Sequence, residues 1–175
     1  MVLAYVLIAV VVIWRIAPHP FFFTPELAAL LYFGYRAPKK ILWLPALAAL
    51  AGADIYLNVA HYGYKLTPDF AITWAWYAGA MWFGSLLKSN HSPLRVAAAA
   101  VVGSLSFFVV SNFSVWLVWH MYPMTFAGLT RCYAAGIPFY RNQFAGDLIF
   151  TAIAFSLPVL ARSFSEVSEP GRHAH

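Results

Sequence analysis

Long apolar runs follow one another along this chain, and they constrain its fold more than any other feature. A bilayer core of about 30 Å is crossed by about 20 helical residues. Because 62% of the 175 residues are hydrophobic and only 10% are charged, the chain has too little polar surface to coat a soluble globule. We therefore predict an all-α integral membrane protein with six transmembrane helices.

The second of the expected helices is short for a full crossing. Pro18 and Pro20 forbid continuation of the first helix, whereas Thr24 and Pro25 make a favourable start for the second. This short helix either tilts in a thinned part of the bilayer or forms a half-helix that protein covers. The expected helices cover residues 1–17, 25–35, 41–58, 70–87, 93–120 and 143–161.

The distribution of basic residues predicts the orientation of the chain. If the N-terminus is cytoplasmic and the chain crosses six times, cytoplasmic segments hold seven Lys and Arg residues and outer segments hold four. We expect a single transmembrane helical domain over 1–162 and a polar cytoplasmic tail over 163–175, so that both termini are cytoplasmic. The seven are Arg36, Lys39, Lys40, Lys88, Arg95, Arg162 and Arg172, and the four are Arg15, Lys65, Arg131 and Arg141.

Charged side chains within the apolar runs are candidates for ligand contact. Such groups cost a few kcal/mol in a bilayer unless they face protein, water or a partner. Asp54 lies near the C-terminal end of the third helix, where the helix dipole disfavours a negative charge. It either contacts a ligand or pairs with a buried partner such as Arg15. Glu26 is better explained by the first turn of the second helix, where the dipole favours a carboxylate.

Polar and aromatic side chains are concentrated between residues 111 and 147, at the expected outer side. Asn112, Trp116 and Trp119 share one face of the fifth helix, and His120 lies beside them. This face could line a ligand pocket. Alternatively, Trp119 belongs to an interfacial aromatic belt, and Asn112 bonds a neighbouring helix.

The connection to the sixth helix carries two arginines. This connection could bind an anionic or planar aromatic ligand as a lid, or could contact lipid headgroups, through Arg131, Tyr133, Tyr140, Arg141 and Asn142. Asp147 is expected to serve the start of the sixth helix or to pair with one of these arginines.

The sequence lacks the motifs of common enzymes and metal sites. No Walker A loop, GxGxxG, HExxH, CxxC or GxSxG occurs, so we do not expect an enzyme. His120 and Cys132 could ligate a soft metal or the cobalt of a corrinoid, but a lone His and a lone Cys make no ligand motif. Such a cysteine is more often a small buried hydrophobe. We predict no metal site and identify no cofactor.

Two stretches carry a family resemblance. The first comprises Arg15 to His19, Phe23 to Pro25, Ala28 to Leu30, and Phe33-Gly34. The second comprises Ser111 to Phe113, Trp116, Met121 to Pro123, Gly128-Leu129, Cys132-Tyr133, Ile137 to Phe139, and Asn142 to Asp147. Together they resemble an uncharacterised bacterial family of small six-helix membrane proteins. Some of its members are identified as substrate-binding S components of energy-coupling-factor (ECF) transporters.

The resemblance implies an uptake function. S components bind vitamins or metal ions from outside and pass them inward within a shared ATP-driven module, and the run from Ala28 through Asp54 is similar to theirs. It implies an S-component-like bundle in the bacterial inner membrane, with an outward-facing pocket and an energising module as partner. The Ala-x-x-x-Ala coupling motif expected in the first helix is absent, because Ala4 is followed by Ile8 and Ala9 by Ile13.

We therefore expect a membrane-embedded binding protein for a small micronutrient such as a vitamin, metal or corrinoid, with no nucleic-acid partner. One alternative is a structural accessory subunit that packs against a larger membrane complex through small-residue faces, such as Ala48 with Gly52. Another is a cofactor-binding or redox protein that uses His120 and Cys132. The expected pocket residues are Asp54, Asn112, Trp116, His120, Arg131, Tyr133 and Asn142.

Overall fold

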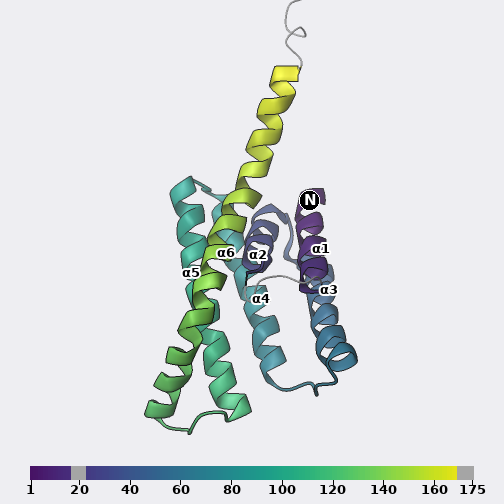
Figure 1. The fold of residues 1–175 in the computed structure, drawn as a ribbon. Coiled ribbons are helices and arrows are strands. Elements are labelled where there is room, and N and C mark those ends of the chain that lie inside the picture. The colour runs from purple at the N-terminus through teal and green to yellow at the C-terminus, as the bar shows by residue number, and fades with distance from the viewer. Residues whose placement is uncertain (17–22, 169–175) are drawn as a thin grey trace, which may run out of the picture.

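The computed structural model describes residues 1–16 and 23–168, with side chains as far as Val159. The described part of the chain contains six α-helices and no strand, as predicted (Figure 1). Two π-helical segments, Tyr56–His61 and Val115–Trp119, extend α3 and α5. The bounds are α1 Val2–Ile16, α2 Glu26–Arg36, α3 Trp43–Ile55, α4 Asp69–Ser85, α5 Pro93–Ser114 and α6 Phe126–Ser168.

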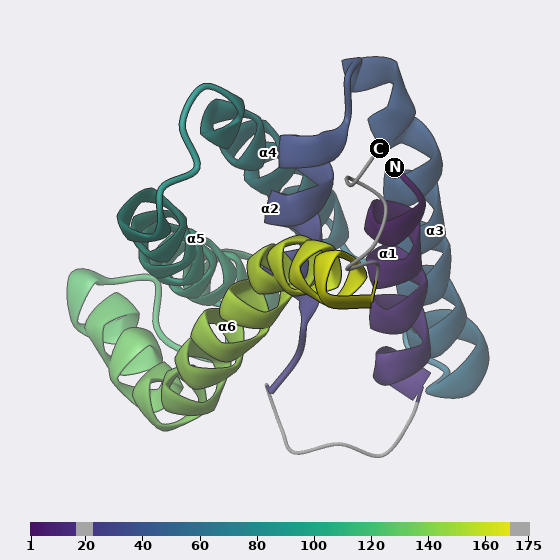
Figure 2. The ribbon, with the colours of Figure 1, turned by 90° about the horizontal axis from the view of Figure 1, so that it is seen from above.

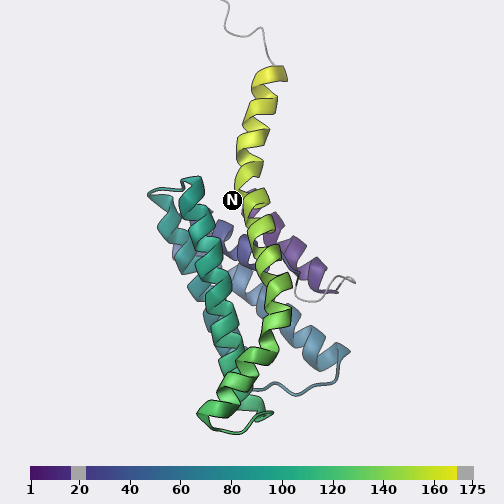
Figure 3. The same ribbon diagram turned by 60° about the vertical axis from the view of Figure 1, so that its left-hand side comes forward.

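Successive helices run in alternating directions (Figures 1 and 3). The N-terminus, the α2–α3 and α4–α5 connections and the far end of α6 therefore lie at one end of the bundle. A hydrogen bond joins the two connections, because the ammonium group of Lys88 donates to the backbone carbonyl of Ala37. The α3–α4 and α5–α6 connections lie at the opposite end.

Helix α2 lies at the centre of the bundle, surrounded by α1, α4, α5 and α6 (Figure 2). All eight residues from Leu27 to Gly34 are buried. A helix that is apolar on every side is stable only when neighbours cover all of it. Of the two expectations for this short helix, a half-helix covered by protein is the one that the fold bears out.

Two glycines allow α2 and α4 to touch at the backbone. A Cβ atom placed on Gly34 would stand 1.8 Å from the carbonyl oxygen of Met81, and one on Gly84 would stand 2.1 Å from that of Leu31. Only a residue without a side chain fits at these two positions. The small residues of α4 thus serve internal packing at this interface.

The predicted start of the sixth helix was wrong. Helix α6 begins at Phe126, not near residue 143, so most of the expected lid is helical. The hydroxyl of Thr125 accepts a hydrogen bond from the backbone N–H of Gly128 (3.1 Å), which satisfies one of the free amides of the first turn. Pro138 lies inside the helix without ending it. In the expected tail, α6 continues to Ser168, and residues 169–175 lie outside the described part, as do Pro18, His19 and Pro20.

Two helical segments are long and apolar enough to cross a membrane, namely Lys40–His61 and Pro93–Trp119. Most residues of both segments are not buried within the bundle. Large apolar side chains are exposed on them, including Ile41, Leu44, Val102, Leu105 and Val109. An apolar surface of this kind suits a hydrocarbon environment better than water.

Candidate functional site

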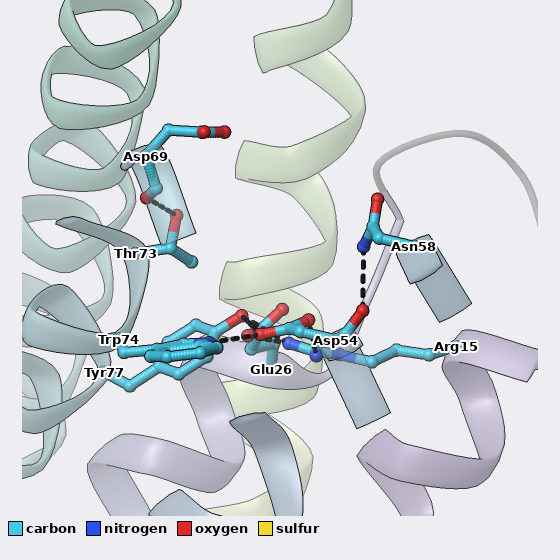
Figure 4. Close-up of polar contacts among 8 residues, drawn as sticks. All are labelled: Arg15, Glu26, Asp54, Asn58, Asp69, Thr73, Trp74 and Tyr77. Carbon is cyan, nitrogen blue, oxygen red and sulfur yellow. Dashed lines mark hydrogen bonds and ion pairs between the residues drawn. The ribbon is translucent and has the colours of Figure 1, made fainter. Parts of the chain in front are cut away.

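A cluster of charged side chains lies where α1, α2 and α3 meet (Figure 4). The guanidinium group of Arg15, at the end of α1, forms ion pairs with the carboxylates of Glu26 and Asp54. Glu26 opens α2 and Asp54 lies near the end of α3. The side chains of Arg15, Glu26 and Asp54 are 11%, 17% and 14% exposed, so the cluster is largely but not fully enclosed.

Two aromatic residues of α4 complete this charged cluster. The hydroxyl of Tyr77 accepts a hydrogen bond from Arg15 (2.6 Å) and donates one to Asp54 (3.2 Å). The indole N–H of Trp74 donates to the same carboxylate (3.0 Å). Trp74 and Tyr77 are three residues apart, which places them on one face of α4. The charged cluster therefore links all four N-terminal helices.

The charges of this cluster do not balance. Arg15 contributes one positive charge, and Glu26 and Asp54 contribute two negative charges when ionised. An uncompensated charge among apolar helices is costly, so the site favours a positively charged ligand or additional hydrogen-bond donors. The pairing of Asp54 with Arg15, one of the two interpretations of Asp54, is confirmed.

Three of the expected pocket residues pack within the α5–α6 hairpin. The side-chain amide of Asn112 donates to the carbonyl of Phe108 in its own helix (2.8 Å), and a Cβ on Gly136 would stand 2.5 Å from the Asn112 side-chain oxygen. The hydroxyl of Tyr133 donates to the carbonyl of Val109 (2.9 Å). The indole of Trp116 donates to the carbonyl of Pro123 (2.9 Å), across the turn between the helices.

The other three residues of this region are exposed. His120 ends the π-helical extension of α5 in a left-handed conformation (φ 50°), with its Nδ1 atom 3.0 Å from the carbonyl oxygen of Val118. Arg131 and Asn142 are exposed on α6. The six residues thus share the α5–α6 hairpin, whereas Asp54 belongs to the charged cluster on α1–α4.

Cys132 does not have the surroundings of a metal ligand. It is buried, and its thiol donates to the carbonyl of Asn112 (3.4 Å). Among the described residues, no group of three or more His, Cys, Asp or Glu side chains could hold a metal ion. The interpretation of Cys132 as a small buried hydrophobe accounts for these contacts.

Two cavities border α6. The larger, of about 770 Å³, is an apolar groove between α5 and α6, lined by residues such as Val96, Ala100, Ala152 and Phe155. The smaller, of about 20 Å³, lies between Glu26 and Asp147. None of the seven expected pocket residues lines either cavity.

Two residues of the charged cluster, Trp74 and Tyr77, were not expected from the sequence. They were missed because aromatic side chains are frequent along the whole chain and carry no distinctive signal.

The expected role of a further residue, Asp147, was also wrong. Asp147 lies well inside α6, so its expected role at a helix start was wrong. Neither of the two ion pairs among the described side chains includes Asp147.

Comparison with known proteins gives the chain a family. No curated protein matches it, and no solved structure matches it. A family model described as "Family of unknown function (DUF6580)" matches residues 1–168. Since this match covers nearly the whole chain, the protein belongs to that family of unknown function.

Proposed function

We propose that this protein is a membrane-embedded, substrate-binding subunit for the uptake of a small micronutrient, similar to the S components of ECF transporters. The observation that carries the proposal is the charged cluster of Arg15, Glu26 and Asp54 inside an apolar helical bundle. Ionisable residues within membrane spans are rare, and they often mark the path or site of a ligand.

The charge of the cluster suggests the class of ligand. One arginine faces two carboxylates, and the three side chains remain 11–17% exposed. A ligand with a cationic group would restore electrical balance by approaching Asp54. The indole of Trp74, which is half-buried, lies beside that carboxylate and offers an aromatic surface for the rest of the molecule. We therefore favour a cationic micronutrient.

The six expected pocket residues on the α5–α6 hairpin would form the opposite wall. The indole N–H of Trp119 donates to the carboxylate of Asp69 (3.3 Å), and this bond ties the hairpin to the start of α4. A shift of the hairpin relative to α4 would open or close access to the cluster. Asn112, Trp116 and Arg131 would then contact ligand in the closed state.

The proposal places the chain in a bacterial inner membrane as a multi-pass protein with cytoplasmic termini. The two segments that could span a membrane and the alternating helix directions support it. In this function the chain hydrolyses nothing itself, and an energising module or another membrane complex supplies the work. The missing Ala-x-x-x-Ala motif of α1 implies a docking face that differs from that of known S components.

Native mass spectrometry of the protein purified in mild detergent tests the proposal. We expect one bound small molecule per chain, lost at least tenfold more readily from Asp54→Asn, which corresponds to about 1.4 kcal/mol. Lys39→Gln is the control, because it removes one charge at an exposed position on the α2–α3 connection, at the other end of the bundle. If no small molecule co-purifies and none from a panel of cationic vitamins and metal ions raises the melting temperature, the proposal fails.

A structural accessory subunit is the second candidate, favoured by one face of α3. Ala48, Ala49 and Gly52 are exposed, and a Cβ atom on Gly52 would meet nothing within 4 Å. Such a smooth face permits close approach of another membrane helix. Companion polypeptides that co-purify with the wild type and are lost from Gly52→Leu would support this function.

A further inference from the structure

The smaller cavity lies at the junction of four elements. It holds about 20 Å³, slightly more than one water-sized sphere, between the start of α2 and the helices α4, α5 and α6. Its polar lining comes from Thr24, Glu26, Gln143 and Asp147, and the remainder is apolar or aromatic. Gly146 allows α6 to approach this point, because a Cβ there would stand 3.3 Å from the backbone nitrogen of Thr24.

Asp147 is only 3% exposed, and its carboxyl group is poorly satisfied. One oxygen accepts a long hydrogen bond from the amide of Gln143 (3.4 Å). Among the described residues, only the neighbouring hydroxyl of Ser104 offers it another hydrogen bond, and no basic side chain pairs with it. A buried carboxylate in this state lacks the compensation that buried charges normally have.

A second buried polar group, the hydroxyl of Ser104, lies beside this carboxyl group. Ser104 is fully buried and lies next to Asp147, and among the described residues its hydroxyl has no hydrogen-bond partner other than that carboxyl group. Ser104 is held close to the cavity lining, because its backbone carbonyl accepts from Gln143 (3.3 Å). A buried hydroxyl and a buried carboxyl without a cation therefore lie on neighbouring helices, beside a cavity that could hold one ion.

The balance of charges around the cavity also favours a bound cation. Among the described side chains, Arg15 is the one cation that pairs with these carboxylates, and its partners are Glu26 and Asp54. With Asp147 ionised, three carboxylates stand against one guanidinium. The atoms of the lining that could bind a metal ion are carboxylate, hydroxyl and amide oxygens, a set that suits hard cations such as Na⁺, Mg²⁺ or Ca²⁺ and does not suit soft metals.

We propose that this cavity binds one small, hard cation between the carboxylates of Glu26 and Asp147, with oxygen ligands from Thr24 and Gln143 and with the Ser104 hydroxyl supporting the carboxylate of Asp147. This cation site adjoins the proposed micronutrient site, but it does not depend on the proposed uptake function. Glu26 belongs to both the cavity and the charged cluster, so the bound cation would also steady the position of the ion pair with Arg15.

The test uses the full-length protein in detergent, freed of metal ions by a chelator and exchanged into choline chloride. The melting temperature is then followed while choline is replaced by Na⁺, or while Mg²⁺ or Ca²⁺ is added at constant ionic strength. We expect a saturable rise with at least one of these cations. Equilibrium dialysis with the radioactive form of that cation should give one ion per chain.

Asp147→Asn removes one ligand charge at constant shape and should weaken the apparent affinity at least tenfold. Ser104→Ala is the second variant, needed if Asp147→Asn fails to fold, and it should weaken affinity severalfold. Asp69→Asn, at the start of α4, should bind like the wild type. A response equal to that of choline, or an unchanged response in both site variants, would overturn the proposal. Each outcome is read without any micronutrient, so it is independent of the proposed uptake function.

Discussion

Gly84 of α4 lies directly against the backbone carbonyl of Leu31 in α2. A Cβ atom at this position would approach the carbonyl oxygen to 2.1 Å, far inside van der Waals contact. The same holds for Gly34 of α2 against Met81 of α4, one contact on each helix. The central helix is therefore held by a pair of reciprocal backbone contacts, and its position depends on two absent side chains.

The first prediction concerns this contact between α2 and α4. Gly84→Ala should lower the free energy of unfolding by about 1–3 kcal/mol or more, because the helices must separate to admit one methyl group. Gly79→Ala is the control on the same helix, since a Cβ there meets nothing within 4 Å. It should be neutral or stabilising by up to about 1 kcal/mol. Denaturant titration in mixed micelles measures both, and equal effects would contradict the packing described.

The second prediction concerns the charged cluster. Arg15→Met leaves the carboxylates of Glu26 and Asp54 together without a cation, which should cost about 3–5 kcal/mol. Adding Glu26→Gln and Asp54→Asn to the same chain should recover part of this loss, because neutral amides need no counter-charge. Thermal unfolding of the single and triple variants provides the comparison. A triple variant less stable than Arg15→Met would show that the carboxylates contribute to stability by another route.

The third prediction concerns the start of α6. Thr125→Ala removes the hydroxyl that accepts from the amide of Gly128, and should destabilise the protein by about 1 kcal/mol. Thr130→Ala is the matched control, because its exposed hydroxyl bonds only the carbonyl of Ala127 within the helix (2.9 Å). Amide hydrogen exchange over residues 126–130 should accelerate in the first variant and not in the second.

The fourth prediction concerns Cys132. Because the thiol is 3% exposed and bonded to the carbonyl of Asn112, N-ethylmaleimide should label it slowly in the folded protein and quickly after denaturation. A cysteine at the exposed neighbouring position, Ala134→Cys in a Cys132→Ser background, should react quickly in both states. Labelling is followed by mass spectrometry. Fast labelling of folded wild type would mean that the hairpin is open at this level.

Much of the helical layout could be predicted from apolar runs and their breakers. The expected ranges of the first five helices agree with the structure to within a few residues, since prolines or charged residues bound each of them. The sixth failed at its start because Pro138, Arg131 and Arg141 resemble a connecting segment. Helix α6 continues past Pro138 because it packs against α5. The signal that could have located its true start is Thr125, whose hydroxyl caps the first turn.

The charged cluster was only partly predictable. A carboxylate at the end of an apolar run demands a partner, and Arg15 was the basic residue available within the same bundle. That Glu26 shares the same arginine depends on where α2 enters the bundle, which no local pattern encodes. The position of Asp147 was missed for the same reason as the start of α6. Its environment depends on which helices pass beside it, and this is a property of the whole fold.

The central position of α2 has a consequence for how such a chain is assembled. Its eleven residues span about 16 Å, roughly half of the hydrocarbon thickness of a bilayer. During synthesis it emerges before α4, α5 and α6, the helices that later cover it. A nascent chain would therefore carry an apolar segment that is too short to cross a bilayer and too apolar to be stable in water. In the membrane-embedded protein proposed above, the N-terminal helices would therefore reach their final arrangement only once the C-terminal helices are present, and insertion would be cooperative over the whole chain.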